Sequence, residues 1–439
     1  MKKLAQVVLW FLIVASTVWA FFVYRPESPP PDKTVVTFAI WGGVAERHAW
    51  EELIADFEKR HPEIQVKLQL IPLKYQEKIL ALLAADIAPD VFTVQIADMI
   101  PKGVLRPIDD FLARDPNFNP DDFVPGVLEL GKWNGKTYNV PSALGPLVLF
   151  YNVRHFREAG LKTPNEYAAE GNWNWDTFVH CCKVLTRRDA SGHVTRWGYR
   201  MYGEWIMWLY ITINGGEPFR SNFRVAQLTE PRTVEGLQRA ADLALVHHVA
   251  PGVSPEELAG MSPAWQDFKR GKVSMMHCGP WMVARLRGME DPYDVAPPPT
   301  EPGGRSTFSA SAITGIWAKC PHPEAAYKWL SYMWSEPARI IWSRLGFDIP
   351  MLKRLIQHKE LWMDPDLAPP HFDVFFDVAQ QVLKKPPSVM PIIPTEANNY
   401  LTRDVWQMIR MGQKTAAEAL AEAQPKVQRI LDEAFAGQP

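Results

Sequence analysis

The chain has 439 residues, enough for two large lobes or about three domains of ordinary size. Lysine and arginine number 47 against 49 aspartate and glutamate, a net charge of −2, which argues against a nucleic-acid-binding surface or an acidic tail as the main theme. Apolar residues make up 47% and charged residues 22%, the proportions of a globular protein with a sizeable core. The 18 tryptophans are many for burial alone, and indole rings commonly stack on ligands.

The N-terminus is apolar. Residues 4–24 carry no charge and follow two lysines, an arrangement that leaves the N-terminus in the cytoplasm and exports the rest. Ala20 suits cleavage by a signal peptidase, whereas the full run is long enough to span a bilayer. Residues 1–24 are therefore predicted to be either a signal peptide or a membrane anchor. Residues 25–33 follow as a proline-rich linker, and the body of the protein is expected to be periplasmic, or anchored to the inner membrane facing the periplasm.

The chain has four cysteines, too few for a disulfide framework. Cys181 and Cys182 are neighbours in a predicted helix, where they cannot easily bond to each other. A bridge between Cys278 and Cys320 is one interpretation after export. The other is that all four are small buried hydrophobic residues.

Strands and helices alternate directly after the linker. Residues 35–40 are β-branched and apolar, as in a buried strand, and apolar side chains at the helical spacing follow over residues 50–57. A second strand is expected at residues 64–70, a second helix at 74–85 and a third strand at 91–94. This order predicts an α/β fold with a parallel sheet and right-handed crossovers. Ligands bind such sheets at the carboxyl ends of the strands.

Later elements follow from the same patterns. Asn134-Gly135 predicts a hairpin turn, and Thr415 with Glu418 forms a capping box that opens the last helix. The remaining predicted elements are strands at residues 147–151, 273–278 and 308–318, and helices at 175–185 and 324–333.

The sequence matches none of the catalytic or metal-binding motifs considered. Residues 131–137 look like a phosphate-binding loop, but three residues separate the glycines where four are needed. His180 and His277 each precede a cysteine, but adjacent side chains on a helix or strand diverge, so one metal site is not expected. Pairs such as Asp109-Asp110 are interpreted as surface acids, because a glycosidase pair requires a separation in space that sequence does not reveal. No metal or cofactor is predicted.

The order of the landmarks is more specific than any single motif. The chain resembles the extracellular solute-binding proteins of ATP-binding-cassette importers, in the sugar-binding branch that includes maltose-binding protein. The resemblance covers nearly everything after the linker. The segments that carry it are residues 53–66, 89–91, 135–141, 149–152, 156–161, 173–178, 214–216, 268–275, 279–281, 391–394 and 412–424.

The resemblance implies a two-lobe periplasmic-binding-protein fold of type II, with a ligand cleft between the lobes. Residues 34–142 plus 296–334 would form lobe 1, and residues 143–295 plus 335–439 would form lobe 2. A mono- or oligosaccharide would bind in the cleft, and the lobes would close around it. The closed form would deliver it to the permease subunits in the membrane. A monomer without cofactor is implied.

Aromatic residues are the first candidates for the binding site, because sugars present apolar faces for stacking and hydroxyls for hydrogen bonds. Trp281 matches the family's stacking tryptophan in Gly-Pro-Trp. Trp205 and Tyr400 fall near other aromatic residues of the family's cleft. Trp41 ends the first predicted strand. Trp208 is a candidate too, with core packing as the alternative.

Polar candidates lie at the carboxyl ends of the predicted strands. Gly42 would let the backbone approach the ligand, or would form a mere tight turn. Glu46 would reach a hydroxyl, or would be an ordinary first-turn acid of a helix. Gln95 and Asp98 follow the third strand and would bind hydroxyls or cap a helix. Ser142 lies at the first crossing between the lobes.

The residues after the third strand depart from the maltose-binding pattern, which has an aromatic and an acidic residue there. The resemblance therefore does not single out maltodextrin as the ligand. Two other functions stay open: a sensory module that presents a sugar to a membrane receptor, and a secreted glycan-active enzyme. An enzyme would consume an oligosaccharide that a binding protein returns intact.

Overall fold

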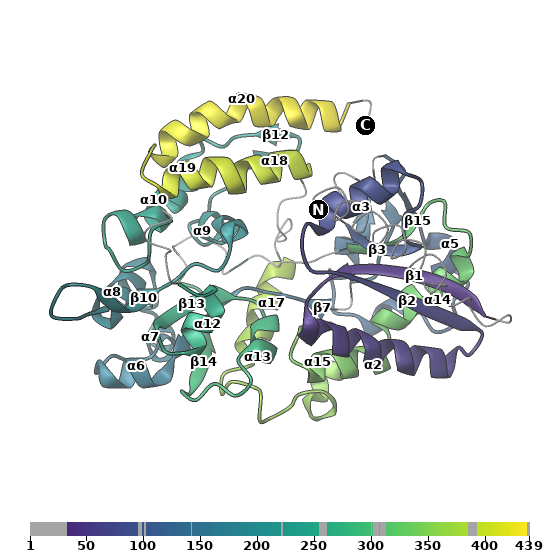
Figure 1. The fold of residues 1–439 in the computed structure, drawn as a ribbon, viewed down its shortest axis with the longest axis horizontal. Coiled ribbons are helices and arrows are strands. Elements are labelled where there is room, and N and C mark those ends of the chain that lie inside the picture. The colour runs from purple at the N-terminus through teal and green to yellow at the C-terminus, as the bar shows by residue number, and fades with distance from the viewer. Residues whose placement is uncertain are drawn as a thin grey trace, which may run out of the picture.

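The computed structural model describes residues 33–94, 99–100, 102–141, 143–220, 223–253, 261–299, 301, 307, 313–384 and 393–436. The predicted signal peptide or anchor lies outside these residues. Within them the chain forms two five-stranded sheets in separate halves of the molecule (Figure 1). No helix in this part of the chain has the length and apolar character needed to cross a membrane.

The sheet of lobe 1 has the strand order β2–β1–β3–β15–β4. β1 (Thr34–Trp41) pairs in parallel with β2 (Ile64–Ile71) and with β3 (Val91–Val94), so the predicted parallel arrangement is confirmed. β15 (Ile313–Trp317) lies antiparallel between β3 and β4 (Leu105–Arg106). Around the sheet are the helices α2 (Val44–Arg60), α3 (Tyr75–Ala84), α5 (Asp109–Leu112), α14 (Pro323–Trp334) and α15 (Glu336–Arg344).

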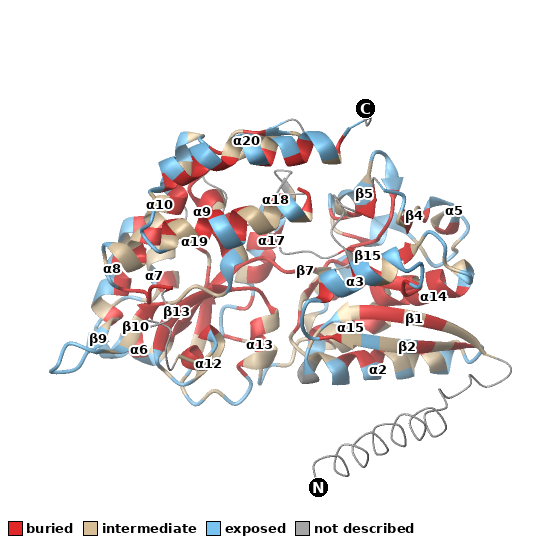
Figure 2. Cartoon of the chain, turned by 45° about the horizontal axis from the view of Figure 1, so that its top comes forward, coloured by how far each residue is buried: buried red, intermediate tan, exposed pale blue. Residues whose placement is uncertain are grey.

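Helices cover both faces of this sheet, because successive side chains of β1 point to opposite sides. Phe38 packs edge-on against Trp50 of α2 and Trp329 of α14, with ring centroids 5.0 and 5.4 Å away. Its neighbour Ala39 belongs to a second apolar cluster, which contains Tyr75 of α3. The buried residues of β1 therefore lie between two layers of helices, as Figure 2 shows.

The sheet of lobe 2 has the order β14–β8–β13–β10–β9. β8 (Val148–Asn152) is buried along its whole length and runs antiparallel to β14 (Tyr293–Ala296) and β13 (Val273–Cys278). β13 is parallel to β10 (Val194–Tyr199), which pairs with β9 (Arg187–Arg188). The helices of this lobe are α6 (Val153–Glu158), α7 (Pro164–Ala169), α8 (Trp175–Leu185), α9 (Met207–Ile213), α10 (Pro231–Leu245), α12 (Ala264–Lys269) and α13 (Trp281–Arg285).

Two-stranded pairs lie outside the two large sheets. The predicted hairpin is confirmed: β5 (Lys132–Trp133) and β6 (Lys136–Thr137) flank Asn134 and Gly135, both at positive φ as a two-residue turn requires. β7 (Ala143–Leu144) pairs with β16 (Ile349–Pro350) where the chain passes between the two halves. Other elements include β11 (Phe219–Arg220), β12 (Val225–Ala226), the short helix η3 (Glu204–Ile206), α16 (Lys353–Gln357) and α17 (Val374–Lys384).

The C-terminal helices pack on lobe 2. α18 (Thr395–Asn399) continues through a π-helical stretch η5 (Tyr400–Val405) into α19 (Trp406–Arg410). α20 (Ala416–Ala434) lies across α18 and α19 (Figure 1). The predicted capping box is confirmed, because the backbone N–H of Thr415 donates to the Glu418 carboxylate at 2.9 Å.

The Cys278–Cys320 bridge is a prediction that the structure contradicts. All four cysteines are free thiols. Cys278 ends β13 in lobe 2, whereas Cys320 follows β15 in lobe 1 and donates its S–H to the Asp90 carboxylate at 3.2 Å. The two residues lie in different lobes. The alternative interpretation as small buried residues holds for Cys181, Cys182 and Cys278, whereas Cys320 is only partly buried.

Candidate functional site

The carboxyl ends of β1 and β13 face each other across the boundary between the lobes. α2 starts just after β1, and α13 starts just after β13. Glu46 in the first turn of α2 accepts a hydrogen bond from the Arg285 guanidinium at the end of α13, with Oε1 3.0 Å from Nη2. Because these strand ends are where open α/β sheets bind ligands, this boundary is the candidate site.

Trp41 provides an exposed aromatic surface on the lobe 1 side. Its side chain is 48% exposed, unusual for an indole at the end of a buried strand. The ring rests edge-on against Tyr75, with centroids 5.5 Å apart. Tyr75 is itself fixed, because its hydroxyl donates to the Ala39 carbonyl at 3.0 Å and accepts from the Thr93 N–H at 3.0 Å. The Trp41 ring is therefore held in place while exposed to a ligand.

Gly42 is a glycine for a packing reason. A Cβ at this position would lie 2.9 Å from both Glu46 Cβ and Leu70 Cδ1, closer than real side chains approach. The turn after β1 therefore needs a residue without a side chain. This requirement is independent of the backbone approach to a ligand that the sequence suggests.

Glu46 is engaged on both carboxylate oxygens. Oε2 accepts from the Gly43 backbone N–H at 2.8 Å, and Oε1 accepts from Arg285. Burial alone would raise the pKa of this carboxyl, but the backbone N–H groups of Gly43 and of Glu46 itself, together with Arg285, lower it below its usual value. Glu46 is thus ionised, caps α2 and pairs across the lobes.

Two tryptophans form an aromatic wall in lobe 2. The rings of Trp205 and Trp281 have centroids 6.2 Å apart and planes inclined by 49°. Each ring folds back over a glycine. A Cβ on Gly279 would lie 2.1 Å from Trp281 Cζ3, and a Cβ on Gly203 would lie 2.7 Å from Trp205 Nε1. The sequence therefore places glycine two residues before each indole so that the ring can lie flat against the backbone.

Tyr202 and Arg285 complete this wall, and neither is predicted from the sequence. Arg285 Nη1 donates to the Tyr202 hydroxyl at 3.2 Å, and the Tyr202 ring meets Trp205 edge-on at 6.4 Å. Burial raises the pKa of Tyr202 to about 12, so the phenol stays protonated. The signal that points to Arg285 is its position four residues after Trp281, on the same face of α13.

Trp208 belongs to the core rather than to this wall. It is 2% exposed, and its indole N–H donates to the Asn398 side chain at 3.1 Å. Tyr400 is partly buried against the same lobe 2 core, and the Lys426 ammonium lies 3.6 Å from its ring centroid. The cation already covers one face of that ring.

Three other predicted site residues, Gln95, Asp98 and Ser142, lie outside the described residues. The structure groups Trp41, Gly42 and Glu46 at the carboxyl end of β1 in lobe 1, and it groups Trp205 with Trp281 in lobe 2. The side chains that tie these two groups together are Glu46 and Arg285.

A serine, a histidine and an aspartate also approach one another in lobe 2, which bears on the enzyme alternative. The Ser274 hydroxyl lies 3.0 Å from His155 Nδ1, and His155 Nε2 lies 3.9 Å from the Asp291 carboxylate. Both Ser274 and His155 are buried, and Asp291 is already paired with Arg154 at 2.7 Å. The Ser274 hydroxyl is buried in the described structure, so this cluster does not support the enzyme alternative.

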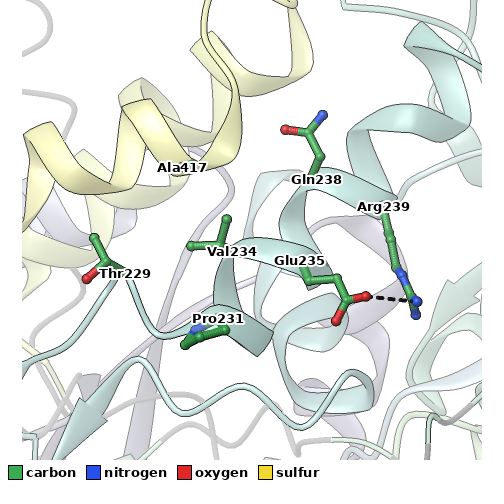
Figure 3. A pocket seen from close by; sticks show the side chains of 7 residues that line it. All are labelled: Thr229, Pro231, Val234, Glu235, Gln238, Arg239 and Ala417. Carbon is green, nitrogen blue, oxygen red and sulfur yellow. Dashed lines mark ion pairs between the residues drawn. The ribbon is translucent and has the colours of Figure 1, made fainter.

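A surface pocket of about 640 Å³ lies elsewhere on lobe 2, between α10 and α20 (Figure 3). It is lined by Thr229, Pro231, Val234, Glu235, Gln238, Arg239 and Ala417. The Arg239 guanidinium on its wall is paired with Glu235 at 2.9 Å and with Glu301 at 3.3 Å. The pocket contains none of the tryptophans at the lobe boundary, so it is not the candidate site.

The fold and this boundary define a two-lobed α/β binding protein. Residues 42–340 match the family described as bacterial extracellular solute-binding proteins, and the chain belongs to that family. An arabinooligosaccharide-binding protein from Halalkalibacterium halodurans is 24% identical over 409 residues, which cover 86% of each chain.

Solved structures agree on the architecture. An ABC substrate-binding protein from Listeria monocytogenes in complex with cycloalternan is 24% identical, with a TM-score of 0.76 over 91% of this chain and 99% of that one. Maltose-bound MalE3 of T. maritima is 20% identical, with a TM-score of 0.72 over 90% of this chain and 99% of that one. The predicted two-lobe periplasmic-binding-protein fold is therefore confirmed.

Proposed function

We propose that the chain is the substrate-binding component of an ABC-type carbohydrate importer and binds an oligosaccharide between its lobes. The observation that carries this proposal is the pair of tryptophans, Trp205 and Trp281, on one side of the boundary with the exposed Trp41 on the other. Stacking on sugar faces is the use that suits such indoles. The names of the relatives support an oligosaccharide over a monosaccharide, because several bind arabinooligosaccharides or maltotriose.

The remaining parts of the proposal follow from this role. The protein acts as a binder and not as an enzyme, as a monomer outside the cytoplasmic membrane, either free in the periplasm or held by residues 4–24. Gln95, Asp98 and Ser142 are proposed to supply hydrogen bonds at the boundary. The partners are the permease subunits of the importer, which receive the sugar when the lobes close.

The proposed lobes are residues 34–142 plus 296–334, and residues 143–295 plus 335–439. The two sheets support this division. α15 packs on α2, where Trp342 lies 4.4 Å from Trp50 between ring centroids. This contact favours placing the last passage between the lobes after Arg344 rather than after Trp334.

The test is a binding screen on the purified chain. Arabinotriose, maltotriose and mannotriose are added in thermal unfolding, with amino acids and polyamines as controls. A ligand at 100 times its dissociation constant stabilises the folded state by about 2.7 kcal/mol, which gives a clear shift. We expect one saccharide class to raise the melting temperature and to be recovered uncleaved. Cleaved product would favour a glycan-active enzyme, and the absence of any shift with sugars would refute the proposal.

A sensory module is distinguished by its partner. Crosslinking in membranes that contain the cognate permease is expected to capture permease subunits. Capture of a receptor kinase would favour the sensory function.

A further inference from the structure

A chain of hydrogen bonds crosses the lobe boundary beneath the tryptophans. It runs from the Gly43 backbone N–H to Glu46 Oε2 at 2.8 Å, from Glu46 Oε1 to Arg285 Nη2 at 3.0 Å, and from Arg285 Nη1 to the Tyr202 hydroxyl at 3.2 Å. Gly43 and Glu46 belong to lobe 1, and the other two residues belong to lobe 2. The chain therefore joins the end of β1 to the aromatic wall of lobe 2.

Each side chain of the central ion pair has a second contact that restricts it. Glu46 is held by the backbone of its own helix start, and the Arg285 guanidinium lies 6.0 Å from the centroid of the Trp265 ring. The two side chains are 16% and 31% exposed, so water screens the pair only in part. A pair this constrained loses little side-chain entropy when it forms, unlike a pair of freely moving surface residues.

The pair also sits next to the proposed stacking surfaces. Arg285 lies one helical turn after Trp281, and Tyr202 contacts Trp205 edge-on at 6.4 Å. On the other side, Gly43 is two residues after Trp41. The Glu46–Arg285 pair therefore joins the helix that follows Trp41 to the helix that begins with Trp281.

We propose that Arg285 is a positioning residue, which through Glu46 fixes the separation of the two aromatic walls and holds the lobes together in the ligand-free chain. This inference rests on the proposed binding function for its effect on affinity, but its effect on lobe geometry does not require any sugar. Apparent affinity scales with the fraction of molecules in the binding-competent arrangement. The ion pair raises that fraction without contacting the ligand.

The experiment compares two substitutions and a matched control in the full chain. Arg285→Gln removes the cation. Glu46→Gln removes the charge but keeps an oxygen that accepts from Gly43, so the start of α2 is preserved. Arg154→Gln is the control, because it breaks an arginine–aspartate pair of 2.7 Å that lies entirely within lobe 2.

Small-angle X-ray scattering of the ligand-free protein is the first readout. We expect both Arg285→Gln and Glu46→Gln to increase the radius of gyration, while Arg154→Gln leaves it unchanged. The radius of gyration of the wild type is also expected to increase in 1 M NaCl, because the electrostatic screening length there falls to about 3 Å. Unchanged scattering in both test variants, with circular dichroism confirming that they fold, would overturn the proposal.

Affinity for maltotriose and arabinotriose is the second readout. If either saccharide binds the wild type, Arg285→Gln is expected to weaken its affinity about tenfold. A tenfold smaller fraction of binding-competent molecules would have this effect. A variant with a larger radius of gyration and unchanged affinity would refute the positioning role. A third outcome is that the wild type binds no saccharide while the two test variants have a larger radius of gyration. That result would support the link between the lobes and count against the sugar-binding function.

Discussion

Trp133 of the β5–β6 hairpin stacks on Phe435, the residue that ends α20, with ring centroids 6.2 Å apart and planes 20° apart. Phe435 is buried in the lobe 2 core, whereas Trp133 also packs against the small apolar cluster of lobe 1. The Arg224 guanidinium lies 5.5 Å from the centroid of the Phe435 ring. The C-terminal end of α20 is thus a second link between the lobes, separate from the Glu46–Arg285 pair.

Phe435→Ala is expected to lower the free energy of unfolding by about 3 kcal/mol, because it removes a buried ring and its stacking contact with Trp133. Phe435→Leu keeps most of the apolar volume and should cost about 1 kcal/mol. Urea unfolding followed by circular dichroism measures both. If the alanine variant unfolds like the wild type, the end of α20 does not contribute to the stability of the two lobes.

Trp281→Ala is expected to weaken saccharide binding about 10- to 100-fold, because aromatic anchors supply a large share of binding energy. Its effect on stability should be small, about 1–2 kcal/mol, since the ring is only partly buried. Trp208→Ala serves as the contrasting variant, with an expected loss of about 3–5 kcal/mol in stability because that ring is 2% exposed. Calorimetric titration and thermal unfolding separate the two effects. Equal affinity loss in folded samples of both variants would contradict the assignment.

Acidification is expected to destabilise the protein through two buried histidines. Burial lowers the pKa of His277 to about 3, and burial with the nearby Arg196 and Arg154 lowers the pKa of His155 to about 4. In the unfolded chain a histidine titrates near 6.5. Between about pH 6.5 and 4 the unfolded state therefore binds more protons, and the stability present above pH 6.5 is lost as the pH falls.

His277→Phe is the variant that tests this effect, because it removes one of the two titrating groups. The difference in unfolding free energy between pH 7 and pH 5 should be smaller than in the wild type, even if the variant is less stable at pH 7. His48→Gln is the control, since that side chain is 80% exposed. An identical pH dependence in all three proteins would show that His277 is not the group responsible.

The thiols are expected to be slow to react. Burial raises the pKa of Cys181, Cys278 and Cys320 to about 12 and that of Cys182 further, so little thiolate forms at pH 8. A thiol-reactive dye should label the native protein slowly and all four cysteines after unfolding in urea. A reductant should leave the melting temperature unchanged. Only two reactive thiols in urea without reductant would indicate a disulfide.

Single helices and strands can be predicted because the sequence patterns that specify them lie within a few neighbouring residues. The strand at residues 273–278 and the helix at 175–185 occur with the predicted bounds. A short, largely apolar run marks the strand, and Asn174 as N-cap with apolar periodicity marks the helix. β15 was expected as a strand, but its insertion between β3 and β4 is set by tertiary pairing over more than 200 residues. No pattern within a short window contains that information.

The site was predictable only in part. Strand ends and a family motif mark the aromatic candidates Trp41, Trp205 and Trp281 in the sequence, and their contact with a ligand stays a prediction. Trp208 lies in the core, a distinction that depends on which face of α9 turns inward. Arg285 was missed, because its importance comes from Glu46, which is 239 residues away in the sequence.

The interleaved strand order of lobe 1 has a consequence for biosynthesis. Its sheet lacks an inner strand until Trp317 has been translated, which at 5–20 residues per second takes roughly 15–60 s. Contacts between such distant segments also form slowly. The topology that builds lobe 1 therefore delays completion of its sheet until most of the polypeptide has been made.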